Sequence, residues 1–137
     1  MASLTAVRDG LKARIETITG VTGYARAVGE VNVPAVVVTP GQIVFDDAMQ
    51  RGSDLLTFTL VLLVTLGDSD LAQQQLDEYL AGSGDRSIKA AVEGDQTLGG
   101  VADWTDVKGV QAYGLIEYAG RQYVGARFPV EVNVDGT

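Results

Sequence analysis

The first eighteen residues have the apolar spacing of an amphipathic helix. The side chains of its apolar stripe, three or four positions apart, are Leu4, Val7, Leu11, Ile15 and Ile18. This spacing follows one face of an α-helix. Ser3 is suited to accept the first free backbone amides as an N-cap, and Gly20 provides a stop after the last turn. The chain is therefore predicted to begin with a helix.

The segment after this helix has the composition of β-strands. Residues 24–28 form a short candidate strand, and residues 35–39 are a β-branched run that the Pro-Gly pair at 40–41 is expected to end. Residues 41–54 are polar and contain glycine, which predicts a mobile loop or arm. Residues 55–66 are the clearest strand, because every even position is apolar while the odd positions mix Leu and Val with Thr.

The second half of the chain predicts two helices and then a long hairpin. A helical spacing over residues 71–80 ends at Gly82-Ser83-Gly84. Asp85 is placed to cap a second short helix over residues 88–92. Tyr118-Ala119-Gly120-Arg121 then has the glycine that a two-residue hairpin turn requires.

This turn fixes which residues of the two final strands face one another. With residues 119–120 in the turn, Leu115 faces Val124, and Lys108 falls opposite Glu131 as a pair of opposite charge. The charge pair agrees with this register, and a three-residue turn, which would also bring apolar residues together, is the alternative. The last strand is apolar at alternate positions, which predicts one buried face.

Together these patterns predict an α+β protein with a single domain over residues 1–137, in which residues 41–54 form a mobile loop or arm. The sheet is mostly antiparallel or mixed, the helices pack on one of its faces, and a long C-terminal β-hairpin ends the chain. A domain of this length buries a sizeable core without the stabilisation that disulfide bonds or metal ions give to smaller proteins.

Both long strand regions are also partly apolar on the face opposite the helices. Helices this short can cover only one face of a sheet, so in a monomer these apolar side chains would stay partly exposed to solvent. Exposed apolar patches of this kind usually mark surfaces that bind a partner. The sequence therefore predicts a homo-oligomer. The residues predicted to lie in a subunit or tube interface are Asp46, Asp47, Arg51, Leu55, Val61, Leu63, Ile116 and Tyr123.

The composition excludes several classes of chemistry. The 137 residues include no Cys and no His, which rules out disulfides, Cys/His metal sites and His-dependent catalytic triads. Ten basic against eighteen acidic residues give a net charge of −8, which opposes tight binding to DNA phosphates. The most apolar run, residues 55–66, is too short to span a bilayer as a helix, so no membrane partner is predicted.

Three short motifs suggest chemistry, and each has a simpler interpretation. Asp46-Asp47 has no third ligand nearby in sequence, which favours a solvated loop or a subunit contact over a metal site. Residues 82–87 lack the Gly-Lys of a phosphate-binding loop and join two helices, and a Ser–Lys dyad with Lys89 is only formally available. Aromatic residues near Arg121 and Arg127 would stack bases only against an unfavourable net charge. The sequence predicts no catalytic residue, cofactor or metal ligand, and no enzyme activity.

Five short sequence segments, here called phrases, occur in a characteristic order between residue 51 and the C-terminal hairpin. They are residues 51–59, 76–84, 86–93 and 97–100 and the hairpin around 123–126. In this order they resemble the tail terminator (tail completion) proteins of long-tailed phages, particularly siphophages of actinobacteria. The N-terminal helix also fits the layout of that family, which has no catalytic motif.

This resemblance implies a structural virion protein in the phage tail, at its head-proximal end, made in the host cytoplasm. Such a protein forms a homohexameric ring that caps the tail tube, ends tube polymerisation and joins the tail to the head or neck. Its implied partners are the tail tube protein on one face and a neck or head-completion protein on the other, with transient, non-specific passage of double-stranded DNA through the lumen. The alternatives are a head–tail connector or stopper protein of the neck, and a ligand-binding α/β domain unrelated to phages.

Overall fold

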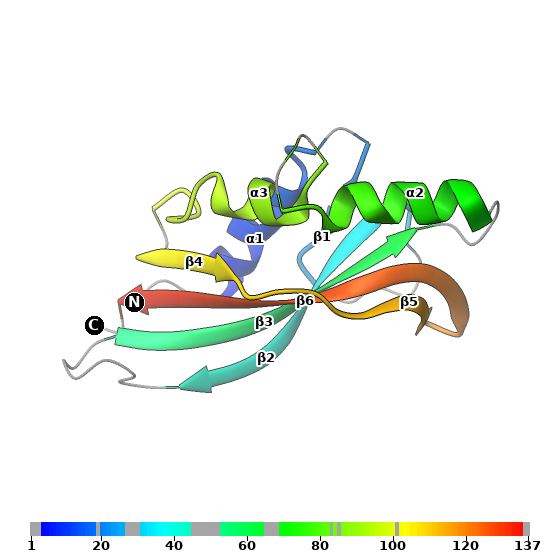
Figure 1. Ribbon diagram of the computed structural model, residues 1–137. Coiled ribbons are helices and arrows are strands. Elements are labelled where there is room, and N and C mark those ends of the chain that lie inside the picture. Colours follow the sequence, from blue (N-terminus) through cyan, green and yellow to red (C-terminus); the bar gives the residue numbers. More distant parts are fainter. Residues whose placement is uncertain are drawn as a thin grey trace.

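The computed structural model describes residues 4–18, 20–26, 31–44, 53–64, 69–82, 84, 86–100 and 102–135. Within these ranges the chain forms a single α+β domain with two layers, in which helices lie on one face of a mixed sheet (Figure 1). This confirms the predicted fold class. No helix in the described part of the chain is long and apolar enough to cross a membrane.

One layer is a six-stranded sheet. Its strands are β1 (Thr22–Tyr24), β2 (Ala35–Val44), β3 (Ser53–Val64), β4 (Trp104–Val107), β5 (Gln111–Tyr118) and β6 (Arg121–Asp135). The strand order is β1-β2-β3-β6, and β4 and β5 both pair with β6. Only β1 and β2 run parallel among these pairs. The long pairing of β3 with β6 forms the centre of the sheet.

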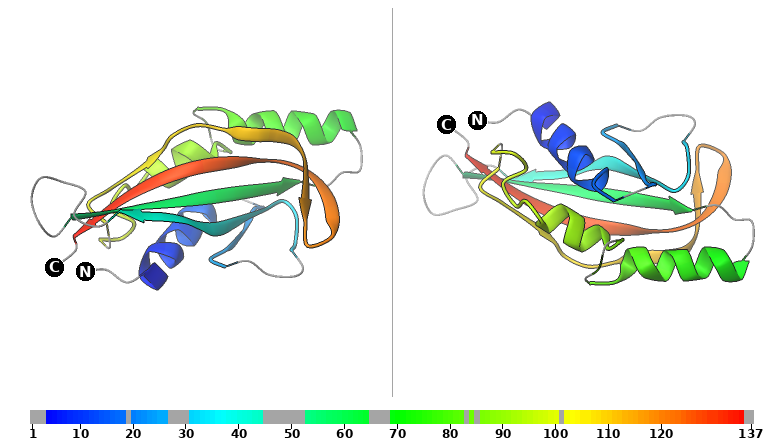
Figure 2. Two further views of the ribbon diagram at one scale, coloured as in Figure 1. Left: turned by 90° about the horizontal axis from the view of Figure 1, so that it is seen from below. Right: turned by 90° about the horizontal axis from the view of Figure 1, so that it is seen from above.

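The second layer consists of helices, which Figure 2 shows from above and below the sheet. They are α1 (Leu4–Ile15), α2 (Ser69–Leu80) and α3 (Ile88–Glu93). Helix α1 contacts β1 and β2, α3 contacts β4, and α2 contacts β3 and β6. Arg14 Nε donates a hydrogen bond of 2.9 Å to the carbonyl of Ala91, which ties α1 to α3.

The main core lies between the helices and the sheet and confirms the predicted apolar patterns. Val7, Leu11 and Ile15 on α1 are buried, as is Ile18 shortly after the end of the helix. Leu4, the first residue of the stripe, is partly buried. The even positions of β3 from Leu56 to Val64 are buried, as are alternate residues of β6 from Val124 to Val134. The N-cap predicted at Ser3 lies outside the described residues.

The two-residue turn predicted for the final hairpin is confirmed. Ala119 and Gly120 have φ angles of 52° and 81°, the left-handed conformations that a type I′ turn needs at both central positions. Leu115 faces Val124 as the predicted register requires. The local sequence of the turn is therefore sufficient to set the pairing next to it.

Further from the turn the predicted register is wrong. A β-bulge between Gln111 and Gly114 shifts the pairing, and Asp106 rather than Lys108 lies directly opposite Glu131. The predicted charge pair still forms, because Lys108 Nζ lies 3.4 Å from Glu131 Oε1. A bulge adds residues to one strand only, so a register that starts at the turn cannot be continued past it.

The prediction that Pro40-Gly41 ends a strand is also wrong. Strand β2 continues to Val44, with a bulge between Pro40 and Ile43. A Cβ atom on Gly41 would overlap the backbone carbonyl oxygen of Thr57. Glycine therefore allows the bulged backbone to pass close to β3, and the strand resumes beyond it.

The short strand predicted over residues 24–28 forms earlier, as β1, and residues 27 and 28 lie outside the described residues. Strand β1 pairs with β2 only as far as Val37. From Val38 onward no described strand lies on the outer side of β2. A proline is tolerated on such an edge because no neighbouring strand needs its missing amide, which accounts for Pro40.

The arm predicted over residues 41–54 is shorter than expected at both ends. Residues 41–44 belong to β2, and residues 53–54 belong to β3. Residues 45–52 lie outside the described residues. The two strands that flank this segment pair directly with one another.

Helix α3 is capped by Ser87, and the prediction of Asp85 as the cap is wrong. Ser87 has an extended backbone, and its Oγ accepts a hydrogen bond of 3.0 Å from the amide of Ala90. The same hydroxyl donates to the carbonyl of Ala81 at the end of α2. Because the helix begins at Ile88, only the residue directly before it can serve as the N-cap.

Candidate interaction surfaces

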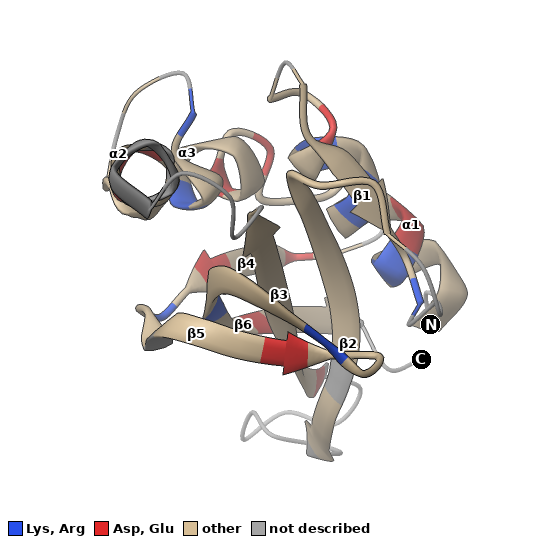
Figure 3. Cartoon of the chain, turned by 90° about the vertical axis from the view of Figure 1, so that its right-hand side faces the viewer, with Lys and Arg blue, Asp and Glu red and all other residues tan. Residues whose placement is uncertain are grey.

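The face of the sheet opposite the helices carries a second, smaller core. Its buried residues are Val37, Val61, Leu63 and Ile116. The partly buried side chains packed against them are Tyr24, Val31, Val33, Tyr118 and Tyr123. The cover comes from the chain itself, because the β5–β6 hairpin bends across the sheet toward β2 (Figure 3).

Two glycines that face each other allow this bend. Gly114 pairs with Gly125 directly after the bulge, and its φ of 135° is open to glycine but not to other residues. A Cβ atom on Gly125 would overlap the carbonyl oxygen of Leu62. The missing side chains therefore let the hairpin lie against β3 while it changes direction.

The prediction that these side chains stay partly exposed to solvent in a monomer is wrong for three residues of the predicted interface. Val61, Leu63 and Ile116 are only 6%, 0% and 3% exposed within the single chain. Tyr123 is half-buried against them, and Leu55 is half-buried on the part of the face that the hairpin leaves uncovered. The residues of the predicted interface that lie outside the described part of the chain are Asp46, Asp47 and Arg51.

The uncovered half of this face carries polar side chains as well as Leu55. Its half-buried threonines are Thr39, Thr57 and Thr59. Beside them Lys108 Nζ lies 2.9 Å from Asp106 Oδ2 and 3.4 Å from Glu131 Oε1. The hydrogen bond between Lys108 and Asp106 raises the pKa of Lys108 and lowers the pKa of Asp106. These groups are solvated, so the ion pairs add little stability.

Two stretches of the sheet edge, on β4 and β2, are unsuited to the addition of another strand. On β4, the carbonyl of Thr105 accepts a hydrogen bond of 3.2 Å from Gln96, and the amide of Val107 donates one of 3.0 Å to Glu93. On β2, Pro40 and the bulge interrupt the outer edge. Such features disfavour edge-to-edge pairing along these two stretches.

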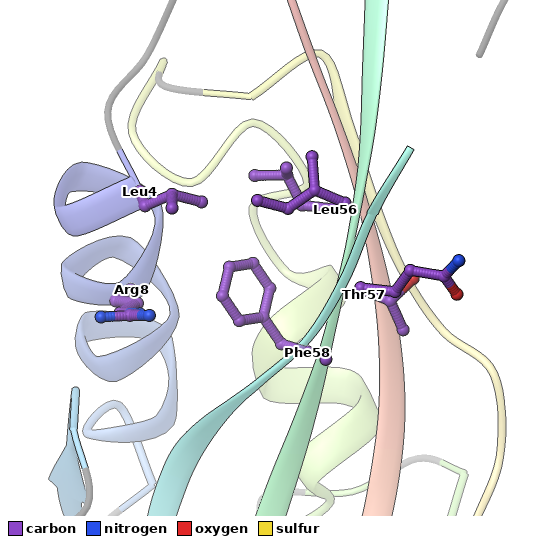
Figure 4. A pocket seen from close by; sticks show the side chains of 8 residues that line it. Leu4, Arg8, Leu56, Thr57 and Phe58 are labelled. Carbon is purple, nitrogen blue, oxygen red and sulfur yellow. The ribbon is translucent and has the colours of Figure 1, made fainter. Parts of the chain in front are cut away.

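A small apolar cavity opens between α1, β2 and β3 (Figure 4). It holds about 60 Å³. The side chains that line it from α1 and β3 include Leu4, Arg8, Leu56 and Phe58. Ile43 lines it from β2 and is 40% exposed, so the cavity is continuous with an apolar surface.

Arg8 is the only charged residue among the described residues that line this cavity. Its Nε atom is buried and has no hydrogen-bond partner within the described part of the chain. A buried donor without an acceptor costs about 1–3 kcal/mol. The other charges on α1 are Asp9, Lys12 and Arg14, so this helix is net positive (Figure 3). The cavity therefore combines apolar walls with a guanidinium whose buried Nε has no hydrogen-bond partner among the described residues.

A shallow cleft between α1 and β1 carries charges of both signs. The charged residues that line it are Asp9, Lys12, Glu16 and Arg26. Lys12 and Glu16 pair at 3.8 Å, and Arg26 donates a hydrogen bond to the Thr5 hydroxyl. These charges balance one another, which makes the cleft a poor match for a ligand of either sign.

Nothing in the described part of the chain groups three or more potential metal ligands. Asp95 instead orders its own loop, since its carboxylate accepts hydrogen bonds from Thr97 and from the amide of Gly99. The bond from the Thr97 side chain, followed by that from Gly99, lowers the pKa of Asp95.

The cavity was not predicted from the sequence. Its walls come from elements that are far apart along the chain, and their meeting is a property of the tertiary structure. The one local signal is Arg8, which lies one helical turn after Leu4 and so borders the apolar stripe. Comparison with models of protein families and with curated proteins finds no match.

Proposed function

We propose that this protein is a structural virion protein, namely a ring-forming tail terminator of a long-tailed phage. In this role it caps the head-proximal end of the tail tube and ends tube polymerisation. It also joins the tail to the head or neck and lets DNA pass through the lumen of its ring. Its partners are other copies of itself, the tail tube protein and a neck or head-completion protein.

The observation that carries this proposal is the order of the phrases over residues 51–134 that resemble the tail terminator family. Four of the five phrases fall on different elements of the fold: residues 55–59 on β3, 76–80 on α2, 86–93 on the cap and body of α3, and 123–126 on β6. The fifth, residues 97–100, lies between α3 and β4. The resemblance implies an α/β sandwich, and an α+β domain with helices on one face of a mixed sheet is compatible with it.

Two physical properties support a role in protein assembly. The outer edge of β4 is occupied by side-chain hydrogen bonds, and the described residues form an apolar cavity that opens to the surface. The net charge of −8 disfavours lasting contacts with DNA phosphates, which suits a lumen through which a duplex slides.

Electron microscopy of virions that lack this gene tests the proposal. Without a terminator, tail tubes are expected to grow beyond their normal length and to remain separate from filled heads. Supplying the wild-type gene from a plasmid is the control and should restore tails of one length. Tails of normal length that fail to join heads would instead identify a connector or stopper of the neck.

A further inference from the structure

The apolar side chain that the described surface exposes most fully is on the hairpin. The large hydrophobic residues with the greatest exposure are Ile43, Trp104, Val110 and Leu115. Leu115 on β5 is 67% exposed, and Glu117 two residues later is exposed as well. Alternate residues of a strand point to the same side, so Leu115 and Glu117 form an apolar knob beside a carboxylate. No described cation forms an ion pair with Glu117.

The cavity between α1, β2 and β3 is complementary to this knob. Its apolar walls suit a leucine side chain, and its one charged residue among those described is Arg8. Helix α1 is net positive, whereas Glu117 is the only charged residue of β5. A leucine followed two residues later by a carboxylate therefore meets apolar walls beside a guanidinium.

We infer that a second copy of this chain docks Leu115 and Glu117 of its β5 strand onto the cavity formed by α1, β2 and β3. This inference rests on the proposed function, because it supplies the contact between subunits that a ring requires. Leu115 enters the apolar cavity next to Ile43 and Phe58. The Glu117 carboxylate approaches the guanidinium of Arg8.

The two patches lie at opposite ends of one subunit. Ile43 pairs with Leu56, which pairs with Val132 of β6, whereas Leu115 pairs with Val124. Eight residues of β6 separate these positions, which is roughly 26 Å along an extended strand. A contact between different patches at opposite ends joins copies head to tail, and it closes into a ring when the rotation per copy divides a full turn.

Engineered cysteines test this contact without interference, because the chain has no cysteine of its own. Two variants, Ile43→Cys and Leu115→Cys, carry tags of different length and are mixed under mild oxidation. We expect a disulfide between the two different variants and almost none within either variant alone. Val110→Cys, which replaces another exposed apolar residue outside the proposed contact, is the control and should not cross-link to Ile43→Cys.

A chain with both Ile43→Cys and Leu115→Cys sharpens the test. The two positions are too far apart for a disulfide within one subunit, so oxidation should give a ladder of covalent oligomers. A ladder that ends at six supports both the contact and the ring. A ladder that continues past six supports the contact and overturns the hexamer of the proposed function.

Truncation of the knob gives a second measurement. Leu115→Ser should weaken self-association by about tenfold or more in sedimentation equilibrium, since a buried leucine is lost. Val110→Ser should leave association unchanged. If the wild-type chain forms oligomers but shows no 43–115 disulfide, or links 43 to 43, the contact is wrong while the ring remains possible. A wild-type chain that stays monomeric at millimolar concentration also overturns the contact, and the length of tails without the gene then decides the function independently.

Discussion

The two faces of the sheet are covered in different ways. On one face, helices lie over a core that follows β3 and β6 along most of their length. On the other face the chain's own β5–β6 hairpin covers only one half, around Leu63 and Ile116, and leaves the threonine-rich half around Thr59 open. The first cover is made by separate elements, and the second by a bend within the sheet.

This difference shows that a strand with two apolar faces does not require a partner subunit. Val61 and Leu63 have the composition of an interface, yet their own chain buries them. Burial by a partner subunit and burial by the chain itself differ in whether the sheet can fold over itself. Here the Gly114–Gly125 pair allows the sheet to do so. The apolar surface that stays exposed is therefore smaller than the apolar pattern indicates.

The largest expected effect contrasts the covered and open halves of the second face. Leu63→Asp places a carboxylate in a fully buried site, at a cost of several kcal/mol that is comparable to the whole stability of a small domain. Thr59→Asp, on the open half of the same strand, should cost about 1 kcal/mol or less. Urea unfolding followed by circular dichroism measures both. Equal losses would mean that the hairpin does not cover Leu63 in solution.

The second prediction tests the bend that lets the β5–β6 hairpin cover Leu63 and Ile116. Gly125→Ala should destabilise the fold by about 2–3 kcal/mol, because its Cβ would collide with the carbonyl of Leu62 and separate β6 from β3. Gly109→Ala is the matched control, since nothing lies within 4 Å of its added Cβ. The control should change stability by about 0.5 kcal/mol or less. Unfolding midpoints in urea give both values.

A neutral result for Gly125→Ala would contradict the tight approach of the two strands. The fluorescence of Trp104, the only tryptophan of the chain, provides a second probe because it lies on β4 beside the same strand β6. Coincident transitions by fluorescence and circular dichroism would show that the variant still unfolds as one unit.

Most of the fold follows from local patterns in the sequence. The helical stripe of α1, the alternation along β3 and the turn at Ala119 and Gly120 each depend on residues close together in the chain, and each is confirmed. The errors arise where tertiary structure decides. Pro40 is compatible with a strand only because the outer side of β2 lacks a neighbour, and this depends on where β1 ends.

The candidate surfaces were harder to predict than the fold. The burial of Val61 and Leu63 depends on the bend of the β5–β6 hairpin, which lies far along the chain from both residues. The sequence nevertheless contains one signal of this bend. The predicted register places Gly114 opposite Gly125, and two glycines on one rung favour a bend. The cavity beside Arg8 has no comparable signal, because it joins three elements whose packing no local pattern specifies.

A smaller effect is expected in the helical layer. Ser87→Ala removes the hydroxyl that caps α3 and bonds to the end of α2, so stability should fall by about 1–2 kcal/mol. Ser87→Thr keeps a hydroxyl at the cap and should recover most of this loss. Thermal unfolding of the three proteins measures the difference. If Ser87→Ala matched the wild type, the link between α2 and α3 would contribute nothing to stability.

The smallest effect compares one half-buried carboxylate on each side of the sheet. Hydrogen bonds, first from the Thr97 side chain, lower the pKa of Asp95, whereas the bond from the charged Lys108 lowers the pKa of Asp106. In both cases the folded pKa lies below the ordinary value of 3.8, so the ionised group stabilises the fold above that pH. This contribution is lost as the pH falls through the folded pKa.

Salt separates the two causes, because it screens a charged partner and leaves neutral donors in place. An NMR titration of the carboxyl groups at low salt and at about 1 M salt should raise the pKa of Asp106 toward its ordinary value and move that of Asp95 less. Lys108→Met should raise the pKa of Asp106 alone, and Thr97→Val that of Asp95 alone. Equal responses of Asp95 and Asp106 to salt would mean that one general field acts on both carboxylates. The contrast between an open face held by solvated charges and a helical side held by local hydrogen bonds would then not hold for these two groups.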